Sequence, residues 1–244
     1  MMKKLLFLTL LAGSLIAQAQ QKPGSGLFKK ATAILDKNKS GGTLSNEEII
    51  AGLKEALTVG ATNSSKKLSL PDGFFANAAI KVLMPPEAKK VESALRSAGM
   101  GNMVDKAILS MNRAAEEASA KAAPIFLEAI KQMSFQDALS ILKGTDTAAT
   151  FYLKQKTTAS LTTAFRPIIE QALAKTDATK YWKDVFDTYN KLPTTFKKIN
   201  SDLPAYVTER SLTGLFYQVA QEEKQIRKDP AARVTETLKK VFAK

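Results

Sequence analysis

Apolar residues recur at helical spacing along almost the whole of this chain. The clearest stripe has members three or four residues apart: Val104, Ile108, Met111, Ala115, Ala118 and Ala122. This spacing places the apolar side chains on one face of a helix, which other helices have to cover. We therefore expect an all-α fold, a single-domain bundle of about ten helices. Residues 80–84, which precede two prolines, are the one place where we also allow a short extended segment.

Several helix ends are marked by the residues that cap them. Ser45 with Glu48, and Ser134 with Asp137, have the spacing of capping boxes, in which each side chain bonds to the backbone of the other residue. Gly144 stands where the helix that starts after Ser134 is expected to end, in the C′ position that glycine favours. These and the other turn signals divide the chain into about ten segments.

Residues 1–19 have the pattern of a secretory signal peptide. Lys3 and Lys4 precede the apolar run 5–16, and Ala17-Gln18-Ala19 fits a cleavage site. The apolar run is too short to span a membrane, so an uncleaved anchor is the weaker alternative. We expect cleavage after Ala19, a periplasmic or secreted location, and a mature chain that does not span the membrane.

The mature chain is predicted to have two parts. Residues 20–43 are expected to form an N-terminal helix and a polar, glycine-rich linker, and residues 44–244 the helical domain. The linker raises the question of a calcium loop, because some of its oxygen-bearing residues have EF-hand spacing. These residues are Asp36, Asn38, Ser40 and Glu47. Thr43 stands where such a loop needs an aliphatic residue, and the sequence has no second EF-hand motif. We therefore expect no metal site, with calcium as a weak alternative.

The charge of the chain favours anionic partners. Removal of Lys3 and Lys4 with the signal peptide lowers the formal net charge from +13 to +11 (13 − 2), which still attracts anions at long range. An anionic component of the envelope or a protein is the expected partner. Nucleic acid is not expected, because the chain is exported and has no basic motif interleaved with aromatic residues. Lysines that only solubilise the helices account for the same charge.

The chain contains no histidine and no cysteine. This excludes the usual general base near neutral pH, a thiol nucleophile and an ordinary zinc site. Carboxylates, hydroxyls and lysines remain as candidates for chemistry. We expect no cofactor.

Two polar clusters lie on or beside the apolar stripes. In the first, Asn112 lies one helical turn after Ile108. Its neighbour Arg113 can reach Glu116 or Glu117, which follow it by three and four residues. The cluster therefore combines an amide and an ion pair on a helix that otherwise carries core residues.

The second cluster is centred on Glu223. Because the apolar stripe from Val219 to Ile226 passes through Glu223, its carboxylate is predicted to be at least partly buried and to need a cation or donors. The candidates are Arg227 on the same helix and Arg113 across the core. Two interpretations remain open: a polar pocket that binds an anion or uses Glu223 as a general acid, or an internal salt-bridge network that fixes helix register.

Five segments form a series: GLKEAL at 52–57, LRSAGMG at 95–101, MNRAAEEA at 111–118, ILKGTDTAATFYL at 141–153, and GLFYQVAQEEKQIRKDPAARVTETLKKVF at 214–242. In this order they resemble the bacterial exported family catalogued as domain of unknown function 4197. The resemblance implies an exported helical protein and carries no activity, substrate or cofactor. Within these segments lie the candidate site residues: Asn112, Arg113, Glu116, Glu222, Glu223, Arg227, Asp229 and Arg233.

These observations favour a non-enzymatic binding or interaction module of the bacterial cell envelope. A hydrolase that uses carboxylates is one alternative, since carboxylates are the acid-base groups that remain. A carrier that holds a lipid or another apolar ligand between its helices is the other, because helical patterning does not separate a packed bundle from a hollow one.

Overall fold

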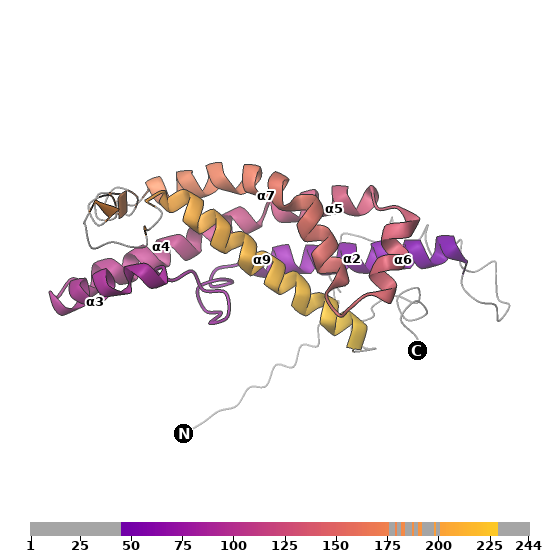
Figure 1. Ribbon diagram of the computed structural model, residues 1–244, viewed down its shortest axis with the longest axis horizontal. Coiled ribbons are helices and arrows are strands. Elements are labelled where there is room, and N and C mark those ends of the chain that lie inside the picture. The colour runs from indigo at the N-terminus through magenta and orange to yellow at the C-terminus, as the bar shows by residue number, and fades with distance from the viewer. Residues whose placement is uncertain are drawn as a thin grey trace, which may run out of the picture. The chain divides into compact units, whose positions relative to one another are not determined.

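The computed structural model describes residues 45–175 and 201–228, together with positions 179, 182, 183, 187, 190, 191 and 198. The elements in these ranges belong to one unit, residues 44–244. In chain order they are α2 (Asn46–Leu68), η1 (Pro86–Ala88), α3 (Lys89–Ser97), α4 (Gly101–Ser119), α5 (Ala122–Lys131), α6 (Phe135–Lys143), α7 (Ala148–Ala174) and α9 (Leu203–Lys228) (Figure 1).

The all-α class is confirmed, because the described residues contain helices and turns and no β-strand. The expected number of about ten helices is not supported by the elements that these ranges contain. None of the described helices is both long and apolar enough to cross a membrane. The predicted signal peptide and the segment 20–43 lie outside the described residues.

The segment 80–84 does not form a strand. Ile80 closes a turn, and residues 81–85 have no regular secondary structure. A side chain takes the hydrogen bonds of this backbone instead: Asn112 of α4 accepts a bond from the N–H of Val82 and donates one to its carbonyl, each at 2.8 Å. One carboxamide thus replaces the neighbouring strand that a β-ladder requires.

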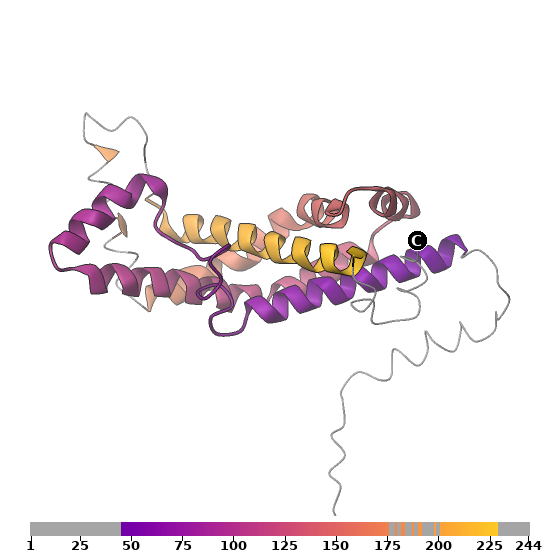
Figure 2. The same cartoon turned by 90° about the horizontal axis from the view of Figure 1, so that it is seen from below.

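The core lies where α2, α4, α7 and α9 pack against one another (Figures 1 and 2). The predicted apolar stripe is buried at every position, with exposures from 0% at Ala118 to 7% at Ile108. Its last member, Ala122, belongs to the first turn of α5 rather than to α4. The small alanines of α4 allow α7 to approach closely.

The longest helix, α7, buries a residue at almost every fourth position. These residues are Ala149, Leu153, Thr157, Leu161, Phe165, Ile169 and Leu173. Pro167 lies inside α7 at an exposed position, and the helix continues beyond it to Ala174. A buried stripe on one side therefore leaves the other side of α7 free to line a surface groove.

Both predicted capping boxes are present. The Ser45 hydroxyl accepts from the N–H of Glu48, whose carboxylate accepts from the N–H of Ser45. The same two bonds join Ser134 and Asp137 at the start of α6. These local bonds satisfy N–H groups that a helix N-terminus leaves without partners.

Gly144 ends α6 as predicted, but for a different reason. Its φ is −80°, so it does not adopt the left-handed conformation that usually selects glycine at this position. A Cβ atom at Gly144 would lie 2.5 Å from the Cβ of Ala148 and 2.9 Å from the carbonyl oxygen of Ser140. Glycine is required because α6 and α7 approach each other closely at this turn.

Candidate functional site

The first predicted cluster holds a loop against α4. Glu116 is 3% exposed, and its Oε1 accepts hydrogen bonds from the N–H groups of Phe74 and Phe75, at 3.0 and 3.1 Å. Its Oε2 accepts from Nη1 of Arg113 at 2.6 Å, and Nη2 of Arg113 donates to Asp72 at 2.7 Å. Arg113 therefore pairs with Glu116 rather than with Glu117, and the pair fixes the turn that follows α2.

Arg113 is kept charged by these contacts. The hydrogen bond to Glu116, and then the one to Asp72, raise the pKa of Arg113 above its ordinary value. Asn112 is fully buried and divides its bonds between Val82 and the carbonyl of Ile108. All the polar groups of this cluster thus bind other parts of the same chain.

The second predicted cluster caps α7 from a distant helix. Glu223 of α9 is 7% exposed, as its place in the apolar stripe predicts. Its Oε1 accepts from the N–H of Ala149 at 3.0 Å, and its Oε2 accepts from the N–H and the hydroxyl of Thr150, each at 2.8 Å. The N-cap residue Thr147 makes no such side-chain bond. Glu223 therefore supplies both the acceptor and the negative charge that a helix N-terminus favours.

Arg227 completes this cluster. Its Nε and Nη2 donate to Oε1 of Glu223 at 3.0 and 2.9 Å, and Nη2 also donates to the carbonyl of Ile141, in the last turn of α6, at 2.9 Å. Of the two predicted cations, Arg227 is the partner of Glu223 and Arg113 is not. Glu222 accepts from Gln218 at 3.0 Å, while Asp229 and Arg233 lie outside the described residues.

The geometry of both clusters favours the salt-bridge interpretation. Each buried carboxylate accepts two backbone N–H bonds and is paired with an arginine. The apolar slot beside Glu223 has a volume of about 20 Å³, which is room for about one water molecule. Glu116 thus joins α4 to the turn after α2, and Glu223 joins α9 to α7, where the slot beside it is too small for a substrate.

A groove of about 360 Å³ between α7 and α9 was not predicted. It is lined by Lys154, Thr158, Thr162, Arg166, Ala205, Thr208, Glu209, Leu212, Thr213 and Phe216. The residues from α7 follow one another at intervals of four, which places them in one row along the helix. In the sequence this row was visible as polar residues beside the apolar stripe, but such a row is also the ordinary pattern of a solvated helix face.

Threonines occur on both walls of this groove, two on α7 and two on α9. Thr158, Thr162 and Thr213 each donate to the backbone carbonyl four residues earlier. Their hydrogens are therefore used, and lone pairs remain to accept bonds from a ligand. Thr208 is 3% exposed, and its hydroxyl has no hydrogen-bond partner. A buried polar group without a partner is rare in native structures and indicates a missing water, ion or ligand.

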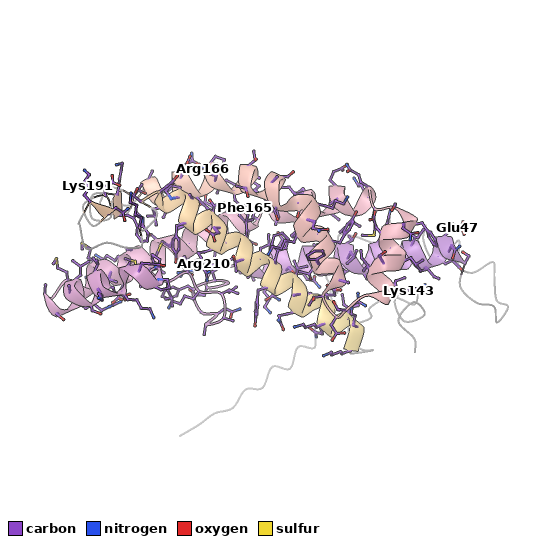
Figure 3. The ribbon with its side chains drawn as sticks, viewed as in Figure 1. Glu47, Lys143, Phe165, Arg166, Lys191 and Arg210 are labelled. Carbon is purple, nitrogen blue, oxygen red and sulfur yellow. The ribbon has the colours of Figure 1, made fainter. Side chains whose placement is uncertain are left out.

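Two cations stand on the α7 wall. Arg166, labelled in Figure 3, donates to Glu170 at 2.8 Å and to Asp202 at 2.7 Å. Burial acts to raise the pKa of Asp202, but the Arg166 hydrogen bond and the Ala205 N–H together lower it below its ordinary value. Lys154 is exposed and forms no ion pair with any described residue. It is the cation of the groove that is available to a ligand.

The calcium hypothesis receives no support from the described residues. Glu47 is exposed in the first turn of α2, where its negative charge interacts favourably with the positive end of the helix dipole. The other three ligands of this hypothesis, Asp36, Asn38 and Ser40, lie outside the described residues. In the part of the chain that is described, acidic side chains do not gather in a group that could hold a metal ion.

Comparison with known proteins gives one match. A family model described as protein of unknown function (DUF4197) matches residues 43–243. No curated protein and no solved structure matches the chain.

Proposed function

The chain belongs to the DUF4197 family, and we propose that it is a non-enzymatic binding protein of the bacterial cell envelope whose ligand lies in the groove between α7 and α9. The signal-peptide pattern of residues 1–19 supports the location. The basic charge of the chain supports an anionic ligand or partner.

One observation carries the assignment of the groove. Thr208 is buried, lines the groove and has an unpartnered hydroxyl. In both predicted polar clusters, by contrast, the buried amide and carboxylates have partners within the chain. An unpaired hydroxyl costs free energy that a bound ligand can recover by bonding to it.

The same contacts disfavour the hydrolase alternative. A general acid or base must reach a substrate atom within hydrogen-bond distance, whereas the oxygens of Glu116 and Glu223 are directed at backbone N–H groups and arginines. Removal of either carboxylate is therefore expected to change stability first.

Two neighbouring threonines provide a matched test. Thr162 lines the groove and Thr163 does not, yet both are exposed on α7 and both donate to the carbonyl four residues earlier. The parent, Thr162→Trp and Thr163→Trp would be produced in the native host, purified from its cell envelope and measured by native and denaturing mass spectrometry. We expect a retained ligand on the parent and on Thr163→Trp, and its loss from Thr162→Trp.

Each result decides the proposal. A ligand that stays bound in Thr162→Trp would place its site elsewhere and contradict the assignment. If all three proteins carry no ligand, the proposed ligand-binding role is contradicted. A protein partner is then favoured and should be sought by crosslinking in living cells.

A further inference from the structure

We propose that the α7–α9 groove binds an extended acidic oligosaccharide, a chain of hydroxylated sugars that carries carboxylates. This inference rests on the proposed function, because it names the ligand class of the same site.

The groove has the form required by a chain rather than by a compact molecule. Near one end of the two helices, Arg166 of α7 bonds to Asp202, and near the other end Thr150 of α7 bonds to Glu223. The helices are therefore antiparallel, and the groove runs along both. Its lining on α7 extends from Lys154 to Arg166, which is about 18 Å at the helical rise per residue.

The threonine hydroxyls of the groove favour a ligand that is rich in hydrogen-bond donors. Thr158, Thr162 and Thr213 offer lone pairs because their own hydrogens are bound to the backbone. Glu209, exposed on the α9 wall, adds a further acceptor. The many O–H groups of a sugar chain complement such acceptors. The hydroxyl of Thr208 is buried behind the lining and can bond to a sugar as donor or acceptor when the side chain turns toward the groove.

Other extended ligands fit these walls less well. An acyl chain would remove the threonine hydroxyls and Glu209 from water without giving them partners, which is costly. A peptide bound in extended form normally pairs with a free strand edge, whereas the N–H and C=O groups inside α7 and α9 are used within the helices. An acyl chain uses none of the polar side chains of the groove, and a peptide backbone offers them only one N–H donor per residue.

The groove also has a lysine on one wall and an apolar floor, and both suit an acidic sugar chain. Lys154, which has no ion pair with any described residue, is positioned to bind a carboxylate. Leu212 and Phe216 are nearly buried in the groove lining and present apolar surface to the C–H face of a sugar ring. One groove thus offers a cation for a carboxylate, acceptors for hydroxyl groups and apolar surface for a sugar ring.

The test is calorimetric titration of the purified full chain with tetragalacturonate, and with maltotetraose as the neutral sugar of equal length. We expect tetragalacturonate to bind and maltotetraose to bind at least about tenfold more weakly, because it lacks the carboxylates. Lys154→Gln should weaken the binding of tetragalacturonate and reduce its dependence on salt. Lys156→Gln, which alters an exposed lysine of α7 outside the groove, should not.

Thr208→Val separates binding from folding. The substitution removes a hydroxyl that has no partner in the free protein, so the thermal unfolding midpoint should stay the same or rise. The affinity for tetragalacturonate should fall by about tenfold, because the ligand then has an unpaired group in the groove. An unchanged affinity would overturn the role of Thr208 and, with it, the inference.

The remaining outcomes distinguish the two proposals. If Thr162→Trp loses a native ligand but the parent binds no tetragalacturonate, the groove is a site and the saccharide class is wrong. Binding to vesicles of phosphatidylglycerol in place of the sugar would overturn the inference in favour of a lipid. If no native ligand is found and no probe binds, both proposals fail.

Discussion

At the scale of single residues, the buried polar groups act as connectors between distant parts of the chain. Asn112 and Glu116 bind backbone groups of the segment between α2 and η1, and Glu223 binds the first turn of α7. Each replaces hydrogen bonds that the backbone would otherwise make to water or to its own secondary structure. Removing such a side chain leaves buried backbone groups unpaired. The free energy of unfolding should therefore fall by more than a single hydrogen bond contributes.

Asn112→Ala is the first prediction. The substitution leaves the N–H and the carbonyl of Val82, a fully buried residue, without their partner. We expect the free energy of unfolding to fall by about 2–4 kcal/mol, measured with urea. Asn102→Ala, an exposed change on the same helix, should stay within about 0.5 kcal/mol of the parent. Equal effects of the two substitutions would refute the connecting role.

Glu223→Gln is the second prediction. The change keeps the shape of the side chain but removes the negative charge that pairs with Arg227, whose side chain is 12% exposed. Breaking a buried pair in this way should lower the free energy of unfolding by about 3 kcal/mol. Glu222→Gln, beside it on α9, removes a partly exposed carboxylate that bonds to Gln218, and should have little effect. A Glu223→Gln protein as stable as the parent would show that the cap is dispensable.

At the scale of the elements, helix ends are set in two ways. The first turns of α2 and α6 are capped by residues three positions apart in the sequence, whereas α7 takes its cap from α9. The turn between α6 and α7 adds a steric requirement, because only Gly144 fits beside Ala148. The local caps were predictable from spacing, and the remote cap was not, because it depends on how α9 packs.

The capping box of α6 predicts a pH dependence. The hydrogen bond from the Ser134 hydroxyl, and then that from its N–H, lower the pKa of Asp137 below its ordinary value of 3.8. A lowered pKa in the folded state means that the contribution to stability is full above the unfolded value and is lost as the pH falls through the folded value. The thermal midpoints of the parent and Asp137→Asn should therefore differ most near neutral pH and converge as the pH falls below the folded-state pKa of Asp137.

The Ser134→Ala protein provides the control for this prediction. It lacks the hydroxyl that is the main cause of the shift, so the pH-dependent difference that Asp137→Asn produces should shrink in this background. A difference of unchanged size would assign the pH dependence to another carboxylate.

At the scale of the whole molecule, the predicted export can be tested by the mass of the protein. We expect the denatured mass of the protein from its own cells to lack residues 1–19. Replacing both Ala17 and Ala19 by leucine should block cleavage and preserve the full mass, because the peptidase requires small residues at these positions. Gln18→Leu, between them, should be processed normally. A full-length parent would contradict cleavage after Ala19.

From the amino-acid sequence one can predict the all-α class, the buried stripe of α4, both capping boxes and the burial of Glu223 one helical turn before Arg227, one of its two candidate cations. All of these depend on spacings of three or four residues, which helix geometry converts directly into contacts. The tertiary structure was needed to show that Asn112 binds Val82, that Glu223 caps α7 and that a groove with threonines on both walls lies between α7 and α9. These features join residues 30 to 74 positions apart, and they arise from the packing of one helix against another, which no local period encodes.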